Sequence, residues 1–180
     1  MLLRDSFHFY CLFLSSMLRA LEPADALLLY EWENDPGVWA QGCTLAPYSL
    51  KQLVDYVENY DADIYSARQL RLMIVADDTG DTVGTVDLYD FDPANSRCGV
   101  GILVAPSYRR KGYALKALTD IADYCRGRLS LHQLWCVVGA ENQASRSLFT
   151  CAGYSASGRL RSWLRSAGSY SDAYIYQLML

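Results

Sequence analysis

The stretch that most restricts the possible folds of this chain is residues 97–125, where an apolar run meets a loop and then a helical repeat. Residues 97–106 read RCGVGILVAP and are apolar enough to form a buried strand. After a short loop, apolar residues recur at helical spacing from about residue 112 to Cys125. A strand, a loop and a helix are therefore expected in direct succession. The end of this loop holds three consecutive cations: Arg109, Arg110 and Lys111.

The cations stand where a helix begins, and this position favours an anion. The first turn of a helix has backbone N–H groups without intrahelical partners, and the helix dipole adds positive potential there. Gly112 lets the backbone approach a ligand closely. The glycine spacing matches neither a dinucleotide fingerprint nor a P-loop. The pattern that is present is Arg-x-x-Gly-x-Ala, which predicts a polyphosphate cradle. The alternative is a basic surface loop that caps a helix.

The rest of the chain predicts a single mixed α/β (α+β) domain over residues 17–180. Strands and helices alternate without a linker, first as an antiparallel meander and then as strand–helix–strand–helix–strand. Ser49 and Gln52 form the sequence pattern of a capping box. The expected strands are 18–21, 70–78, 82–91, 97–106, 134–138 and 171–180, and the other expected helices are 22–35, 49–60 and 142–154.

Charge is distributed unevenly along the chain. The formal net charge is −4, which argues against a nucleic-acid partner. Residues 1–100 hold 16 acidic and 6 basic residues, whereas residues 101–180 hold 4 acidic and 10 basic residues. One half therefore suits a cationic ligand and the other an anionic one, unless the charges merely cluster on solvated faces.

The cysteines and the N-terminal residues bear on the compartment. The 6 cysteines are scattered, with no C-x-x-C pair, so we expect no metal site and a reducing, cytoplasmic environment. Residues 1–16 are apolar but too short and interrupted to span a bilayer, and we expect no membrane partner. They are interpreted as an N-terminal extension of unclear role. A signal peptide, and hence a secreted binding protein, is the weaker alternative.

A second motif follows the cation loop at a fitting distance. In residues 131–154 a strand is followed by Asn142 and by a helix that carries Leu148 and Phe149 and ends near Gly153. Together, the two motifs resemble the GNAT superfamily of acetyl-CoA-dependent N-acetyltransferases. Its pyrophosphate loop has the form [Q/R]-x-x-G-x-[G/A]. The resemblance covers roughly residues 18–180. The tail resembles the branch of spermidine and ribosomal-protein acetyltransferases, and the segments YEWENDP and VGTVDLYDFDP resemble the spermidine branch in particular.

The resemblance implies a GNAT-like fold, in which the sheet splays between two parallel strands and the pantetheine arm of acetyl-CoA enters the gap. By this likeness residues 102–104 lie along the arm, the amides of residues 110–115 cradle the pyrophosphate, and Asn142 binds the pantetheine. A helix N-cap is the rival role for this asparagine. The expected acetyl-CoA-binding residues are Ile102, Leu103, Val104, Arg109, Arg110, Lys111, Gly112, Tyr113, Ala114, Leu115, Asn142 and Phe149.

The resemblance also implies direct attack of an amine on the thioester. An alkyl amine has a pKa of about 10.4 and has to lose a proton first. Asp87 is the leading candidate for this step and for amine binding, and Glu33 and Asp35 are candidates for binding a polycation. Many family members carry tyrosine where this chain has Phe149, as general acid for the thiolate. A thiol with a pKa of about 8.5 can leave without that acid.

The most direct functional prediction is an N-acetyltransferase that acts on a polyamine such as spermidine, as a homo-oligomer. One alternative keeps the fold but takes a protein N-terminus or an aminoglycoside as acceptor. Another is an acetyl-CoA-binding module without turnover, for which Phe149 is the support.

Overall fold

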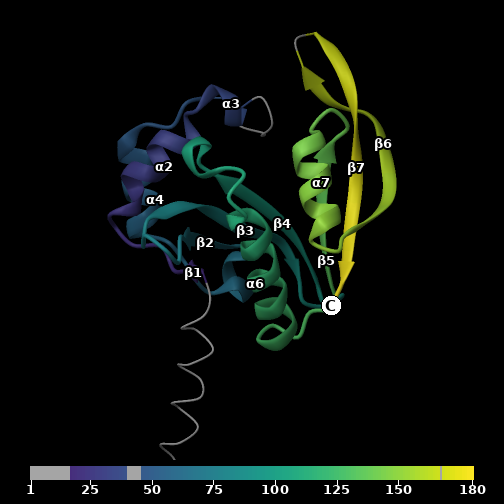
Figure 1. The fold of residues 1–180 in the computed structure, drawn as a ribbon. Coiled ribbons are helices and arrows are strands. Elements are labelled where there is room, and N and C mark those ends of the chain that lie inside the picture. The colour runs from purple at the N-terminus through teal and green to yellow at the C-terminus, as the bar shows by residue number, and fades with distance from the viewer. Residues whose placement is uncertain (1–16, 40–45, 167) are drawn as a thin grey trace, which may run out of the picture.

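The computed structural model describes residues 17–39, 46–166 and 168–180. Within them, seven strands form one mixed sheet in the order β1-β2-β3-β4-β5-β7-β6 (Figure 1). The strands are β1 (Leu18–Arg19), β2 (Leu70–Val75), β3 (Thr82–Asp92), β4 (Arg97–Val104), β5 (Gln133–Gly139), β6 (Ser155–Ser166) and β7 (Ser169–Met179). The helices are α2 (Asp25–Glu33), α3 (Pro36–Trp39), α4 (Leu50–Glu58), α5 (Ile64–Ala67), the short 3₁₀ helix η1 (Pro106–Tyr108), α6 (Tyr113–Gly127) and α7 (Gln143–Cys151).

The sheet is divided between β4 and β5. Strands β1 to β4 form an antiparallel meander, and β5, β7 and β6 form a second antiparallel group. The two groups join through a parallel pairing of β4 with β5 that covers only Arg97–Gly99 against Gln133–Trp135. Beyond Gly99 the two strands part, and Figure 1 shows them diverging toward the end of the molecule where α3 and α7 lie. The splayed sheet expected from the resemblance is therefore present.

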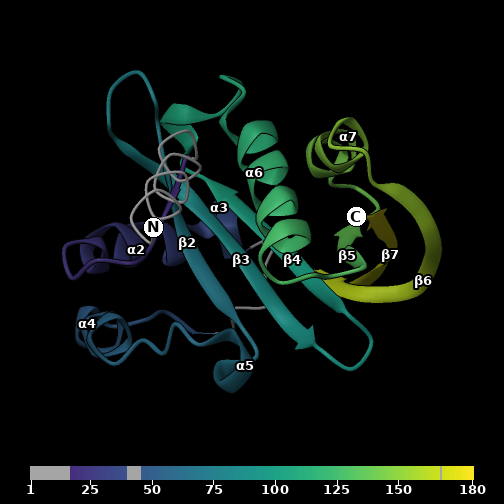
Figure 2. The ribbon, with the colours of Figure 1, turned by 90° about the horizontal axis from the view of Figure 1, so that it is seen from below.

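Two apolar clusters cover the two faces of the meander. Helix α6 packs on one face, where Leu118 and Ile121 meet Ile74, Val86 and other buried side chains of the strands. Helices α2 and α4 lie side by side on the other face, where Leu29 and Leu53 pack with Met73 (Figure 2). Because apolar side chains alternate between faces along a strand, neighbouring residues of β2 serve different clusters.

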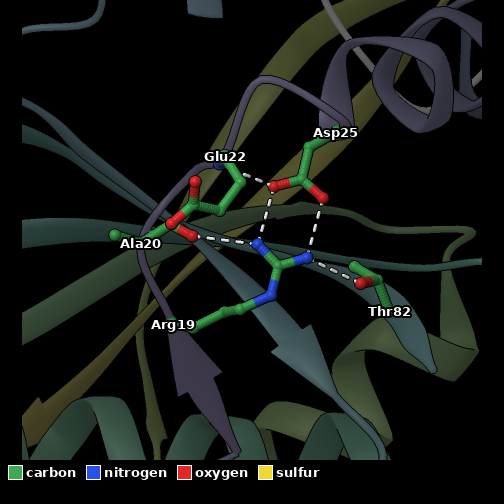
Figure 3. A network of polar contacts seen from close by, with 5 residues as sticks. All are labelled: Arg19, Ala20, Glu22, Asp25 and Thr82. Atoms are coloured by element: carbon green, nitrogen blue, oxygen red, sulfur yellow. Dashed lines mark hydrogen bonds and ion pairs between the residues drawn. The ribbon is translucent and has the colours of Figure 1, made fainter. Parts of the chain in front are cut away.

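A polar network fixes the start of α2 to the sheet (Figure 3). The Arg19 guanidinium on β1 donates to both carboxylate oxygens of Asp25, at 2.6 and 2.7 Å, and to Thr82 Oγ1 on β3 at 2.7 Å. The Glu22 backbone N–H also donates to Asp25. This carboxylate is buried, so its charge is neutralised where water does not reach it. The network therefore sets the position from which α2 extends.

Most expected elements are present with shifted bounds. Helix α4 carries the predicted capping box of Ser49 and Gln52, and α2 begins at Asp25, later than expected. Strand β6 and helices α3 and α5 were not predicted. Strand β6 contains three arginines and Gly158, and most of its side chains are exposed at the sheet edge. An edge strand that buries little has no apolar alternation to reveal it.

Some expectations fall outside the described part of the chain. The proposed extension 1–16, Cys11 and Cys43 belong to the segments that are not described. Among the described helices, none has the length and apolar character needed to cross a membrane.

Candidate functional site

A cleft with a volume of about 650 Å³ opens where β4 and β5 part. One wall is β4 from Val100 to Val104, and the other is β5 from Cys136 to Gly139 together with α7. Eleven of the twelve expected acetyl-CoA-binding residues line this cleft: Ile102, Leu103, Val104, Arg109, Arg110, Gly112, Tyr113, Ala114, Leu115, Asn142 and Phe149. A single elongated site thus collects residues that are spread over almost 50 positions of sequence.

The exception is Lys111, which does not line the cleft. Its ammonium group lies over the ring of Tyr108, with Nζ 5.1 Å from the ring centroid. Its neighbours Arg109 and Arg110 border the cleft, as does Tyr108. Arg109 is held in place because its Nε donates a hydrogen bond to the carbonyl oxygen of Val104 at 2.9 Å.

The first turn of α6 faces the cleft without a side-chain cap. Gly112 is the N-cap residue and has φ of 90°, a left-handed conformation that glycine adopts without strain. No atom lies within 4 Å of where its Cβ would be, so its backbone angle, rather than crowding, requires glycine in this structure. Helix α4, by contrast, has its first turn capped by Ser49. Uncapped N–H groups and the helix dipole make this end of α6 suited to an anion.

The turn between β2 and β3 braces this cradle from outside. Tyr108 Oη donates to Asp81 at 3.2 Å, and Tyr113 Oη donates to Asp78 at 3.0 Å. Lys116, in the second turn of α6, pairs with Asp77 at 2.5 Å. Three carboxylates of one turn therefore hold η1 and the start of α6. Sequence reasoning assigned Asp77 and Asp78 to the end of a strand and missed these contacts, because they join residues 27 to 39 positions apart.

Asn142 and Phe149 enter the cleft from α7. Asn142 caps this helix, since its Oδ1 accepts a hydrogen bond from the Ser145 N–H at 3.1 Å. The rival role considered from sequence is therefore realised, on a residue that also lines the cleft. Phe149 is 4% exposed and packs edge-on against Tyr154, with ring centroids 5.1 Å apart.

A cysteine also borders the cleft, but it is a poor nucleophile. Burial raises the pKa of the Cys136 thiol to about 12. The thiolate is the nucleophilic form of cysteine, and at neutral pH this side chain remains a thiol. The arrangement favours direct transfer of an acyl group over a covalent intermediate on Cys136.

A second cavity, of about 430 Å³, lies on the face of the sheet that carries α2 and α4. Its wall includes Asp87 of β3, Arg71 of β2 and Tyr56 of α4. Arg71, Asp87 and Gly101 lie directly opposite one another on adjacent strands. The cavity therefore contains the residue expected to receive the amine proton.

Arg71 binds two of the three candidate carboxylates. Its Nε donates to Asp87 at 2.6 Å, and a terminal nitrogen pairs with Glu33 at 2.8 Å. Burial opposes the charge of Arg71, but the two carboxylates outweigh this effect and raise its pKa. Sequence reasoning missed Arg71, although a charged residue between Leu70 and Leu72 in a strand is the kind of signal that could have revealed it.

Asp35 has a different position from Asp87 and Glu33. Its carboxylate accepts a hydrogen bond from the Gly37 N–H at 2.7 Å. This contact shapes the start of α3, which brings Gly37 and Val38 to the edge of the cleft. Neither Asp35 nor Glu33 is part of the wall of the second cavity, although Glu33 pairs with Arg71 of that wall.

The two cavities share two wall residues, Tyr89 and Gly101. A group bound in the cleft and a group bound in the second cavity can therefore meet at this point of β3 and β4. The geometry is that of a two-substrate site, with an anion-binding cradle at one end and a carboxylate-bearing cavity at the other.

Comparison with known proteins agrees with this geometry. A family model described as an acetyltransferase (GNAT) domain matches residues 16–155. The spermidine N(1)-acetyltransferase of Escherichia coli (strain K12) is 27% identical over 162 residues, which cover 88% of this chain and 83% of that protein. That of Vibrio cholerae is 26% identical over 155 residues, covering 86% of this chain and 87% of that protein.

Solved structures extend the likeness to the fold. The V. cholerae spermidine N-acetyltransferase in complex with CoA and spermine superimposes with a TM-score of 0.79 at 24% identity, covering 90% of this chain and 94% of that one. RimL, a ribosomal L7/L12 alpha-N-protein acetyltransferase in complex with CoA, gives 0.80 at 15% identity, covering 91% and 93%. The chain therefore belongs to the GNAT acetyltransferase family and is an N-acetyltransferase that uses acetyl-CoA.

Proposed function

We propose that this enzyme transfers the acetyl group of acetyl-CoA to a primary amine of a polyamine such as spermidine. The observation that carries the proposal is the meeting of the two cavities at Tyr89 and Gly101, with Asp87 in the wall of the second. An ammonium group held near Asp87 would face a thioester in the cleft. The relatives named spermidine N(1)-acetyltransferase support the same class of acceptor.

In this proposal acetyl-CoA lies along the open side of β4. Beyond Gly99, β4 has no strand beside it on the β5 side within the described residues, so Ile102, Leu103 and Val104 can offer backbone groups to the pantetheine arm. The diphosphate sits at the N–H groups of Tyr113, Ala114 and Leu115, beside the guanidinium groups bordering the cleft. Electrostatic attraction and the helix dipole act in the same direction there.

The acceptor amine has to bind as a cation and react as a base. Asp87 in the wall of the second cavity and Glu33, which pairs with Arg71 of that wall, carry two negative charges, and Arg71 neutralises one of them. The remaining negative charge attracts an ammonium group. Asp87 then takes the amine proton, directly or through water, and the neutral nitrogen attacks the thioester carbon.

A second acceptor class, an amine with a single positive charge such as a protein N-terminus, is favoured by the ion pairs of Arg71. Because this guanidinium already binds Asp87 and Glu33, the cavity has less charge for a polycation than its carboxylates alone would give. The structural likeness to RimL agrees with this class only at the level of the fold.

Initial rates of CoA release test the proposal on spermidine, spermine, N-terminal peptides and aminoglycosides. We expect spermidine to give the highest kcat/KM, and the Asp87→Ala variant to lose roughly 100-fold or more of it, the scale of a general base. Asp123→Ala is the matched control, because Asp123 is exposed on α6 and pairs only with Arg126 in the described contacts. A higher kcat/KM for N-terminal peptides than for spermidine would favour the second acceptor class over polyamines. Full activity of Asp87→Ala would refute the role of this carboxylate.

We also propose that the enzyme works in the cytoplasm as a homo-oligomer. Three of the four described cysteines are buried free thiols, which suits a reducing compartment. A spermidine N-acetyltransferase of V. cholerae, 23% identical, is described as dodecameric. Light scattering on the purified full chain measures the assembly, and a monomer at micromolar concentration would contradict it.

A further inference from the structure

We propose that Tyr89 is the general acid that protonates the departing thiol of CoA. Tyr89 and Gly101 are the two residues common to the walls of both cavities, and Tyr89 is the one with a side chain. The inference concerns the acyl transfer itself and rests on the placement of acetyl-CoA in the cleft proposed above.

The ring of Tyr89 crosses the line where the sheet begins to open. Tyr89, Gly99 and Trp135 face one another across β3, β4 and β5, and Gly99–Trp135 is the last pair before the strands part. A Cβ on Gly99 would lie 2.6 Å from Cζ, the ring carbon that bears the hydroxyl, so glycine is required for the ring to lie there. The ring also packs edge-on against Trp135 at 5.3 Å. Tyr89 is therefore fixed at the inner end of the cleft.

The position that many relatives use for this proton is apolar here. Phe149 reaches the cleft from the face covered by α6 and has no exchangeable proton. Tyr89 extends from β3 on the opposite face, the one that carries Asp87 and α2. A thioester at the inner end of the cleft would thus have apolar contact on one side and a phenol on the other.

Three other proton donors of the cleft, Tyr108, Tyr113 and Cys136, are less suited to this step. The hydroxyl groups of Tyr108 and Tyr113 lie at the cradle, which they brace by donating to Asp81 and Asp78. Cys136 holds its proton tightly, because burial raises its pKa to about 12. None of these three residues also borders the second cavity, where the amine is expected.

The proposed acetyl transfer conserves protons and electrons. The amine nitrogen forms a bond to the carbonyl carbon, and the carbon–sulfur bond then breaks with its electron pair going to sulfur. The Tyr89 hydroxyl hydrogen-bonds to the sulfur as negative charge develops and transfers its proton. The proton that the amine loses passes to Asp87 or to solvent, from which the phenolate is reprotonated. At neutral pH both a free phenol, with a pKa of about 10, and a free thiol, with a pKa of about 8.5, are protonated.

The test compares Tyr89→Phe, Phe149→Tyr and the double variant, with Tyr170→Phe as control for an exposed tyrosine. Hydroxylamine serves as nucleophile beside the best amine of the panel, because it is neutral at pH 7 and does not depend on recognition in the second cavity. We expect Tyr89→Phe to lower kcat roughly 100-fold with both nucleophiles, the scale of a general acid, while KM for acetyl-CoA stays within about two-fold. Phe149→Tyr in the same chain should restore at least a tenth of the wild-type kcat.

Two further readouts separate proton donation from packing. In the wild type kcat should fall at alkaline pH as the phenol ionises, and this decline should be absent from Tyr89→Phe. Circular dichroism melting checks that both single variants fold. Unchanged kcat in Tyr89→Phe, or loss without rescue by Phe149→Tyr, would overturn the proposal. If the wild type acetylates hydroxylamine but not polyamines, the acceptor proposed above is refuted. The role of Tyr89 can still be tested in that case, because the variants are compared with hydroxylamine as nucleophile.

Discussion

Arg71 shows how a single side chain decides the charge of the second cavity. Its guanidinium, Asp87 and Glu33 together have a net charge of −1, and each side chain is largely buried. Charges in such a position are stable only while they are paired. The arginine therefore contributes to the stability of the fold as well as to the charge of the second cavity.

Replacing Arg71 with methionine should destabilise the protein in a pH-dependent way. Two neighbouring carboxylates lose their shared cation, and we expect a loss of roughly 3 kcal/mol at pH 7, the lower end for buried pairs because about a fifth of each side chain is exposed. The loss should shrink by pH 4.5, since protonation removes the repulsion. Urea unfolding at both pH values measures it. Lys51→Met, which breaks an exposed pair with Asp55, should change little; an equal loss at both pH values would exclude the charge explanation.

The buried carboxylate of Asp25 should also make the stability of the protein depend on pH, in a more acidic range than the Arg71 cluster. Burial alone would raise its pKa, but the hydrogen bonds from Arg19 and from the Glu22 N–H outweigh burial and lower it. A lowered pKa in the folded state adds stability above the unfolded value of about 3.9, and this stability disappears as pH falls through the folded value. Asp25→Asn should therefore be less stable than the wild type at pH 7 and approach it below pH 4. Thermal melts across pH 2.5–7 test this, with Asp123→Asn as the exposed control.

At the scale of elements, the sequence predicts what is encoded locally. The capping box of Ser49 and the glycine at the start of α6 depend on residues within one turn, and both are present in the structure. Strand β6 depends on pairing with β7 and buries little, so its own residues do not indicate it. The contacts of Arg71 and Tyr89 depend on strand register, which joins residues that are distant in sequence. The residues at the start of α6 were thus predictable as part of the cleft wall, whereas only Asp87 was predicted among the wall residues of the second cavity.

Two glycines of α6 separate the role of backbone conformation from that of size. Gly112 has φ of 90° and Gly127 does not have a positive φ, while both have open space around the position of a Cβ. Gly112→Ala should strain the first turn by about 1 kcal/mol and weaken CoA binding several-fold. Gly127→Ala should leave CoA affinity unchanged and add roughly 0.5 kcal/mol of stability. Isothermal titration calorimetry measures the affinity for CoA, and urea unfolding measures the stability. Equal CoA affinities of the two variants would show that the conformation of Gly112 does not contribute to binding.

At the scale of the whole molecule, the parting of β4 and β5 divides the sheet into two groups that share one short pairing. A ligand in the cleft contacts both groups, through β4 on one side and α7 on the other. We expect CoA at 100 times its dissociation constant to add about 2.7 kcal/mol of stability. Hydrogen exchange should slow in residues 101–104 and at the start of α6, and remain unchanged in the hairpin of β6 and β7. Protection confined to the hairpin would place the ligand elsewhere.

The division of the sheet has a consequence beyond catalysis. Chains that are transiently opened are the ones that proteases remove, and the population of opened chains falls as a bound ligand stabilises the folded state. In the proposed site the acetyl donor fills the wedge between the two strand groups, so that the donor would act as a removable structural part of its own enzyme. The lifetime of the protein in a cell should therefore follow the supply of activated acetate, with more enzyme retained when carbon is plentiful.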